Sequence, residues 1–207
     1  MSTLKREIIR KLIHLIEVPI IVGYSVIHFY FSPKIGVLSL TGLLLLLFEI
    51  EYFRIDYQTR IGAQITEFFG KFVLRRHERN NVVGAIFFVI STIIAFSVFE
   101  YPLALLALLL SVFGDLAAAI MGIAFGKTKI FRNKSYIGSI SGLVVNILIG
   151  FILIPAYPQI FLSMAFTASV VETLTQKLDD NLTVPLFAGF VGQLIVFWDK
   201  IVLPPFF

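Results

Sequence analysis

Apolar residues run through this chain in long stretches that are separated by short polar segments. A helix needs roughly 20 residues to cross a hydrocarbon layer of about 30 Å. Seven stretches come near that length, and they cover residues 12–32, 35–53, 82–99, 101–124, 137–155, 156–175 and 184–203. A count of six is the alternative. The pattern predicts an all-α integral membrane protein, a bundle of about seven transmembrane helices.

A shorter amphipathic stretch, residues 61–77, separates the second apolar stretch from the third. Its apolar side chains fall on one helical stripe, formed by Ile61, Ile65, Phe68, Phe69, Phe72 and Val73. Since it is too short to cross the bilayer, we expect a short helix that lies in the membrane interface. No internal repeat or Pro/Gly-rich linker divides the chain, so residues 1–207 are expected to form a single polytopic domain.

Composition supports a lipid environment and narrows the available chemistry. The 207 residues are 58% hydrophobic and only 14% charged, and they include 22 Phe. Together with a mean hydropathy of +0.93, this leaves too little polar surface for a soluble globular protein. The chain has no cysteine, which excludes disulfides, thiolate nucleophiles and Cys-ligated zinc. Any metal would be held by oxygen or histidine ligands.

The basic residues indicate an orientation. Of the 17 Lys and Arg, four precede the first stretch, six lie between the second and third, four between the fourth and fifth, and one between the sixth and seventh. These connections alternate, so the positive-inside rule places them and the N-terminus in the cytosol. Because the charges adjoin apolar stretches and are not interleaved with exposed aromatics, we predict contact with the lipid bilayer and no nucleic-acid binding.

One carboxylate stands inside an apolar stretch. Asp115 lies about ten residues from the expected cytosolic end of residues 101–124. An ionised carboxylate near the bilayer centre costs about 2.5–3.5 kcal/mol even on lenient insertion scales. Asp115 is therefore expected to face protein, water or an ion.

A basic segment, residues 127–133, precedes the next apolar stretch. Residues 134–139 are expected to open a helix, with Ser135 as its N-cap. A helix N-terminus beside Lys127 and Lys134 can hold phosphate through backbone N–H groups, the helix dipole and lysine charge. Residues 122–128 are not a P-loop, because three residues separate the two glycines where that motif has four.

Small residues recur on one face of each of these two apolar stretches. The first face follows Asp115 and is formed by Ala118, Ala119, Gly122 and Gly126. The second face has a small or polar residue at every fourth position and is formed by Gly138, Gly142, Asn146 and Gly150. Small faces let helix backbones approach closely. We expect the two helices to pack beneath the basic segment, and packing alone is the alternative explanation for the glycines.

Further acidic residues follow at Glu172 and at Asp179 and Asp180. Asp180 and Asn181 offer oxygen ligands, and Mg²⁺ suits such a site because it takes one or two carboxylates plus phosphate oxygens. The alternative for the two aspartates is a solvated turn. Thr183 is expected to cap the last helix, with Pro185 in its first turn.

Near the N-terminus, Glu7, Arg10, Lys11 and His14 are spaced along one helical face. This face is expected to border a cytosolic cleft, with lipid anchoring by the basic residues as the alternative. His14 is predicted to pair with Glu17.

Taken in order, the motifs resemble the CTP-dependent lipid-alcohol kinases, namely dolichol kinase, phytol kinase and CTP-dependent diacylglycerol kinase, which are distantly related to phosphatidate cytidylyltransferase. The matching segments cover residues 5–14, 75–78 with Gly84, 114–122 with 125–127, 134–139 and 180–185. The second segment contains Arg76 and Glu78. Ile137 occupies the position at which the family pattern usually has glutamate.

The resemblance implies transfer of the γ-phosphoryl group of CTP to the hydroxyl of a membrane lipid alcohol. It implies Mg²⁺ at Asp115, Asp180 and Asn181, and Glu172 as the group that orients or deprotonates the hydroxyl. The triphosphate would contact Lys127, Lys134, Ser135, Gly138 and Ser139, with support from Glu7, Arg10, Lys11, His14, Arg76 and Glu78. Two alternatives stay open: nucleotidyl transfer to phosphatidate, and a proton-coupled transporter. The sequence identifies neither the lipid nor the oligomeric state.

Overall fold

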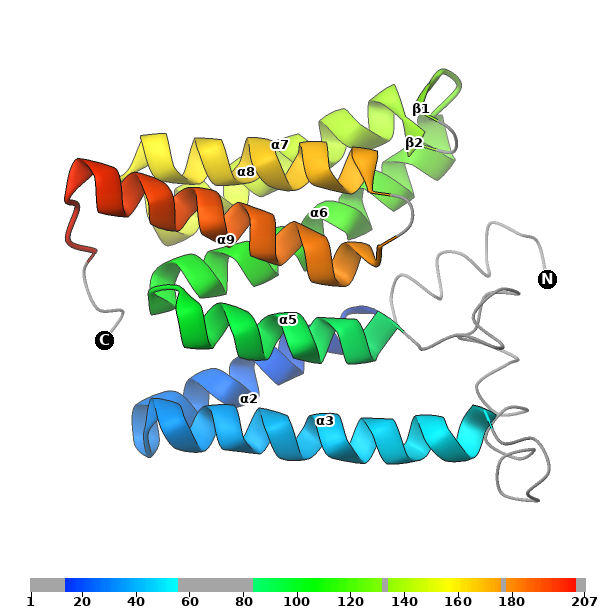
Figure 1. Cartoon of the computed structure of the whole chain (residues 1–207). Helices are drawn as coiled ribbons and strands as arrows, with labels where there is room; N and C mark the ends of the chain where they lie inside the picture. Colours follow the sequence, from blue (N-terminus) through cyan, green and yellow to red (C-terminus); the bar gives the residue numbers. More distant parts are fainter. Residues whose placement is uncertain (1–13, 56–83, 132–133, 176–177, 204–207) are drawn as a thin grey trace. The chain divides into compact units, whose positions relative to one another are not determined.

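The computed structural model describes residues 14–55, 84–131, 134–175 and 178–203 (Figure 1). The chain divides into two compact units, Met1–Ile90 and Ser91–Phe207. Each unit is described by itself. The expected amphipathic helix at residues 61–77 lies outside the described residues.

The first unit contains two helices, α2 (Glu17–Tyr30) and α3 (Pro33–Ile55). The turn between them is set by proline, because Pro33 has no N–H to lose at the first position of a helix. The ring of Tyr24 packs on Gly36, where a Cβ would lie 2.7 Å from the ring. Near the end of α3, Arg54 forms a buried two-pronged ion pair with Glu51, with both N···O distances at 2.6 Å.

Helix α5 (Gly84–Val98) begins in the first unit and ends in the second. The second unit continues with α6 (Tyr101–Phe125), strands β1 (Lys129–Phe131) and β2 (Lys134–Ser135), and helices α7 (Tyr136–Leu153), α8 (Pro158–Leu174) and α9 (Asp180–Asp199). The two strands pair antiparallel as a small hairpin between α6 and α7.

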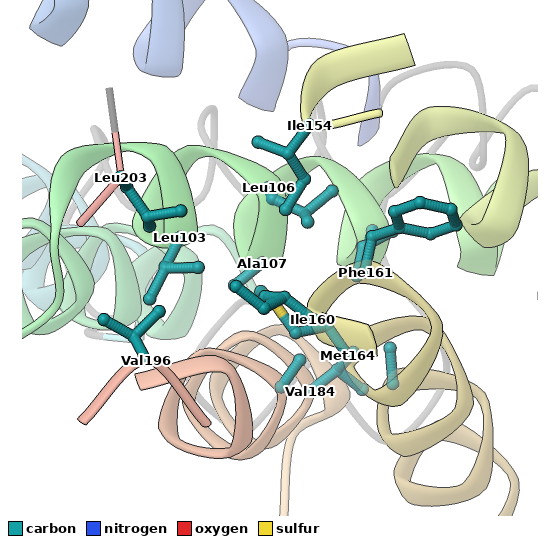
Figure 2. Packing of buried hydrophobic residues seen from close by; sticks show 13 residues of the cluster. Leu103, Leu106, Ala107, Ile154, Ile160, Phe161, Met164, Val184, Val196 and Leu203 are labelled. Carbon is teal, nitrogen blue, oxygen red and sulfur yellow. The ribbon is translucent and has the colours of Figure 1, made fainter. Parts of the chain in front are cut away.

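Helix α6 packs against α7, α8 and α9. The apolar core of the second unit collects on these helices and is drawn in Figure 2; its most buried members include Leu103, Leu106, Ile160 and Met164.

Proline shapes three helices of the second unit. Pro102 and Pro158 lie in the first turns of α6 and α8, where the missing N–H costs nothing. Pro185 lies inside α9, so the carbonyl of Asn181 four residues earlier lacks its usual helical donor. The Ser91 hydroxyl of α5 donates to that carbonyl at 2.8 Å, which satisfies the buried acceptor.

The α6–α7 contact is a close approach of two backbones. The buried residues of α7 are Gly138, Gly142, Asn146 and Gly150, as the spacing predicted. A Cβ on Gly138 would lie 2.7 Å from the Ala118 carbonyl oxygen, and one on Gly142 would lie 3.1 Å from the Gly114 carbonyl oxygen. The small faces therefore do bring the two helices together.

The all-α prediction agrees with the helical architecture, and seven helices of the described part fall within or near the seven predicted stretches. Four of them, within the described residues, are long and apolar enough to cross a membrane by length and composition: Pro33–Arg54, Tyr101–Phe125, Tyr136–Leu153 and Asp180–Asp199. Helices α2 and α5 are apolar but shorter. The full count of membrane crossings and the orientation remain predictions.

Two local details differ from the prediction or add to it. Helix α7 begins at Tyr136 with Ser135 as its N-cap, as predicted, but Lys134 and Ser135 also form strand β2, which was not expected. Helix α9 begins at Asp180 and is capped by Asp179, whose carboxylate accepts the Asn181 N–H at 3.0 Å. Thr183 is already helical, and its hydroxyl donates to the Asp179 carbonyl. An aspartate offers a charged acceptor to the free N–H groups of the first turn, which makes it the better cap.

Candidate active site

The N-terminus of α7 directly follows the β1–β2 hairpin. The Ser135 hydroxyl accepts the Gly138 N–H at 3.1 Å, which confirms Ser135 as the N-cap. The Tyr136 N–H donates to the Thr128 carbonyl at 3.1 Å and so ties the helix start to the hairpin. Gly122 and Gly126 leave room for the Ser135 side chain, because a Cβ at either position would meet its hydroxyl. Lys127 lies exposed just after α6.

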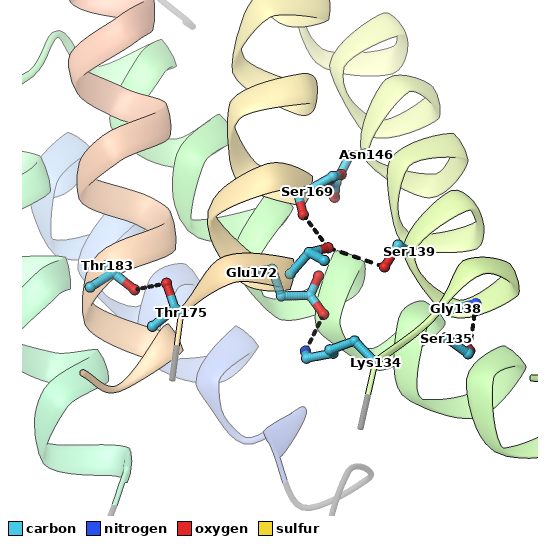
Figure 3. Close-up of polar contacts among 10 residues, drawn as sticks. Lys134, Ser135, Gly138, Ser139, Asn146, Ser169, Glu172, Thr175 and Thr183 are labelled. Atoms are coloured by element: carbon cyan, nitrogen blue, oxygen red, sulfur yellow. Dashed lines mark hydrogen bonds and ion pairs between the residues drawn. The ribbon is translucent and has the colours of Figure 1, made fainter. Parts of the chain in front are cut away.

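Lys134 reaches from the hairpin to helix α8. Its ammonium donates to Glu172 Oε1 at 2.7 Å, as Figure 3 shows. The Lys134 side chain is 33% exposed, whereas that of Glu172 is only 6% exposed. A buried carboxylate needs a compensating charge, and this contact supplies it. Glu172 Oε2 lies close to Gly142, 3.6 Å from where a Cβ would stand.

Two further carboxylates act on this pair. Burial alone lowers the pKa of the Lys134 ammonium, but the Glu172 carboxylate, joined by Asp115 and Asp180, outweighs it and leaves that pKa raised. Three predicted site residues, on α6, α8 and α9, therefore lie within electrostatic range of Lys134 on β2. This is the set on which the predicted chemistry depends, and we call Lys134, Glu172, Asp115 and Asp180 the charged cluster.

The charged cluster is compatible with Mg²⁺ by the chemistry of its donors. In the described part of the chain, no group of three His, Cys, Asp or Glu side chains is placed to hold a metal ion by itself. Mg²⁺ needs only one or two carboxylates, because water and phosphate oxygens fill its other positions. Asn181 lies at the start of α9, is buried, and follows Asp180 directly. The assignment of metal ligands remains a prediction.

The other predicted phosphate ligands occupy different surroundings. The Gly138 N–H is engaged by the cap, and the Ser139 hydroxyl lies 3.1 Å from Thr173 Oγ1 on α8. Sequence reasoning missed Thr173 and Ser169, which lie on α8 on either side of Glu172. Their signal was present as two hydroxyl residues four positions apart beside a carboxylate in an apolar helix.

Of the N-terminal set, only His14 is described. Its Nδ1 lies 3.0 Å from Glu17 Oε1 in the first unit, so the predicted pairing is confirmed. The other supporting residues lie outside the described part of the chain: Glu7, Arg10, Lys11, Arg76 and Glu78.

Comparison with known proteins finds relatives whose names describe lipid kinases. Phytol kinase 1, chloroplastic, of Arabidopsis thaliana is 35% identical over an alignment that covers 50% of this chain and 40% of the relative. CTP-dependent diacylglycerol kinase 1 of Schizosaccharomyces pombe is 28% identical, with 60% and 65% covered. The chain is similar to phytol kinase and to CTP-dependent diacylglycerol kinases, two of the kinases that the motifs resemble.

A third relative extends the match along the chain. CTP-dependent diacylglycerol kinase 1 of Saccharomyces cerevisiae is 24% identical over 70% of this chain and 56% of the relative. The chain thus spans between two fifths and two thirds of the length of these curated relatives. No family model matches the chain, and no solved structure matches it significantly.

Proposed function

We propose that this protein is an integral membrane enzyme that transfers the γ-phosphoryl group of CTP to the hydroxyl of a membrane lipid alcohol, on the cytosolic side of the bilayer. The charged cluster carries the proposal: Lys134 pairs with Glu172 directly before the start of α7, and Asp115 and Asp180 act electrostatically on the same lysine. The relatives support it, because their names describe kinases of phytol and of diacylglycerol.

The acceptor step needs a group that takes the proton of the hydroxyl. In the proposed reaction the lipid oxygen forms a bond to the γ-phosphorus, the bond from that phosphorus to the bridging oxygen breaks, and CDP leaves. Glu172, which is buried on α8, is the group that we assign to accept the hydroxyl proton. While Lys134 donates to its carboxylate at 2.7 Å, Glu172 is a weaker base.

Binding of the nucleotide would break the Lys134–Glu172 contact. Nucleotide phosphates attract Lys134, because an ammonium binds phosphate as readily as carboxylate. When Lys134 turns to the phosphates, Glu172 loses its partner and becomes a stronger base beside the incoming hydroxyl. Exposed Lys127 and the dipole of α7 add positive potential for the triphosphate. Phosphoryl transfer depends mainly on such positioning and charge neutralisation.

Mg²⁺ would be held by Asp115 and Asp180, with Asn181 beside them. Bound there, it would neutralise charge on the phosphates. Asp115 is the decisive residue, because it lies within an apolar helix where a carboxylate without a functional role is costly.

The test separates the possible reactions by their labelled products. Purified protein is incubated with Mg²⁺, with CTP labelled at either the α- or the γ-phosphorus, and with phytol, a polyprenol, diacylglycerol or phosphatidate. We expect γ-label in a phosphorylated lipid alcohol. Asp115→Asn should lower the rate by at least about 100-fold, whereas Asp199→Asn, at the exposed far end of α9, should not change it.

Two results would contradict the proposal. Transfer of α-label to phosphatidate with release of pyrophosphate would indicate a nucleotidyl transferase. Absence of nucleotide binding, combined with flux in proteoliposomes that depends on Asp115, would indicate a transporter.

A further inference from the structure

Two hydrogen bonds join α7 to α8 on either side of Glu172 (Figure 3). Ser139 Oγ lies 3.1 Å from Thr173 Oγ1, and Asn146 Nδ2 donates to Ser169 Oγ at 3.2 Å. Thr173 directly follows Glu172, and Ser169 precedes it by almost one helical turn. The two contacts therefore fix which face of α8 is turned towards α7, and Glu172 lies on that face.

Asn146 also touches α6. Only 1% of the residue is exposed, and a Cβ on Gly114 would lie 2.6 Å from Asn146 Oδ1. Among the described residues, Oδ1 has no hydrogen-bond partner. The amide thus lies between Gly114, the neighbour of Asp115 on α6, and Ser169, one turn from Glu172 on α8.

An apolar side chain would fill this space at lower cost, because a buried acceptor without a donor is destabilising. The amide is long enough to contact the α6 backbone and to hold the Ser169 hydroxyl at the same time. It therefore connects the helix of Asp115 with the helix of Glu172.

We propose that Asn146 is a positioning residue, which sets the separation and relative rotation of the two helices that carry Asp115 and Glu172. This role rests on the proposed function only in naming those two carboxylates as reactive groups. A displacement of about 1 Å at a reacting group can lower a rate by about 100-fold, so the contact of Asn146 with both helices governs turnover although Asn146 need not touch substrate.

The experiment uses the full chain with Asn146→Leu, Ser169→Ala and the double variant. Leu keeps a similar volume but cannot bond Ser169, and Ser169→Ala removes the same hydrogen bond from the other side with little change in packing. Ser141→Ala is the matched control, because the Ser141 hydroxyl on the same helix bonds only to the Ile137 carbonyl of its own helix at 2.7 Å. Rates are expressed per folded protein.

We expect each single variant to lower kcat by about 10- to 100-fold with little change in the KM for CTP. The double variant should be no slower than the slower single variant, since both remove one interaction. Ser141→Ala should match the wild type. If Asn146→Leu does not fold, Ser169→Ala decides. A kcat within twofold of wild type in the folded single variants would overturn the proposal.

A second measurement does not depend on catalysis. Because the chain has no cysteine, spin labels can be placed through Ile120→Cys on α6 and Leu174→Cys on α8, two side chains that are 36% and 60% exposed. Pulsed EPR should give a narrow distance distribution for the wild type and a shifted or broadened one for Asn146→Leu and Ser169→Ala. Identical distributions would overturn the positioning role. An inactive wild type with the expected distance changes would instead contradict the proposed function alone.

Discussion

Lys134 and Glu172 compensate each other's charge. Glu172 is almost fully buried, and its carboxylate is tolerated there because the Lys134 ammonium lies 2.7 Å away. Removing one member of such a pair leaves an uncompensated buried charge, which costs more than the pair contributes. Charge-neutral variants of Glu172 are therefore easier to interpret than variants that leave the carboxylate without Lys134.

The raised pKa of Lys134 predicts a sensitivity to alkali. A lysine whose folded-state pKa exceeds its unfolded value stabilises the fold below about pH 10.4, and this contribution disappears as pH rises through the folded-state pKa. We expect the unfolding temperature of the wild type to fall more steeply above about pH 10.4 than that of Glu172→Gln, whose Lys134 lacks the carboxylate partner. Thermal unfolding in detergent between pH 8 and pH 11.5 measures the difference.

Lys134→Arg serves as the control, because arginine stays charged over this range. It should flatten the alkaline slope as Glu172→Gln does. Equal slopes in the wild type and in both variants would show that the pair does not contribute.

The charged residues themselves were predictable, but their partners were not. Asp115 and Glu172 stand out because carboxylates are rare in apolar stretches, and Ser135 was predictable as a cap before a helical run. The Lys134–Glu172 contact joins residues 38 positions apart and depends on how the hairpin and α8 meet, which the sequence pattern does not specify. Thr183 was predicted as the cap because Pro185 suggested a later helix start.

Helices α6 and α7 approach each other closely at glycines, where the backbone of one helix meets the other. Gly138 faces the Ala118 carbonyl, and Gly142 faces the carbonyl of Gly114. Such proximity maximises dispersion contacts where lipid offers no hydrophobic drive for helices to associate. The distance between α6 and α7, and with it the setting of Asp115 relative to Lys134, is determined by the absence of side chains on these glycines.

Gly138→Ala is expected to destabilise the protein by about 1–3 kcal/mol, because its Cβ would lie 2.7 Å from the rigid Ala118 carbonyl oxygen. Gly42→Ala in α3 is the control. A Cβ there meets nothing within 4 Å, so the higher helix propensity of alanine should leave stability unchanged or raise it by up to about 1 kcal/mol. Denaturant unfolding in micelles measures both. Equal effects at the two positions would contradict the close approach of α6 and α7.

Element positions were predicted well because each helix coincides with an apolar run, and the helix-spaced glycines correctly identified the face of α7 that is buried. The β1–β2 hairpin was not predicted, since strands of three and two residues leave no periodic pattern. Helix ends shifted by a few residues where a cap or a proline set the boundary, as at Asp179 and Pro158.

The distribution of basic residues along the chain predicts how the whole molecule is oriented in the bilayer. Alternate connections carry nearly all Lys and Arg, which favours one orientation in the bilayer. In the predicted orientation, the segment between residues 126 and 135 lies on the basic, cytosolic side and the segment around Lys34 lies on the opposite side. Structure alone leaves this orientation as a prediction, because helix packing is the same from either side.

Single cysteines provide the test, because the native chain contains none. We expect Ile130→Cys in the exposed hairpin to react with a membrane-impermeant maleimide in inside-out vesicles, and Lys34→Cys to react in right-side-out vesicles. Both positions are exposed, so access depends on sidedness. Labelling of both from the same side would contradict the predicted topology.

The close packing of α6 against α7 has a consequence for how the chain is inserted into the membrane. These two segments have the highest mean hydropathy of the four candidate spans, 2.4 and 2.1, yet they carry Asp115 and Asn146 towards their interior. Leaving the translocon one at a time, each would present a polar group to lipid tails. Released together as a preassembled hairpin, they shield these groups from lipid, so we expect the nascent chain to partition into the bilayer as a two-helix unit.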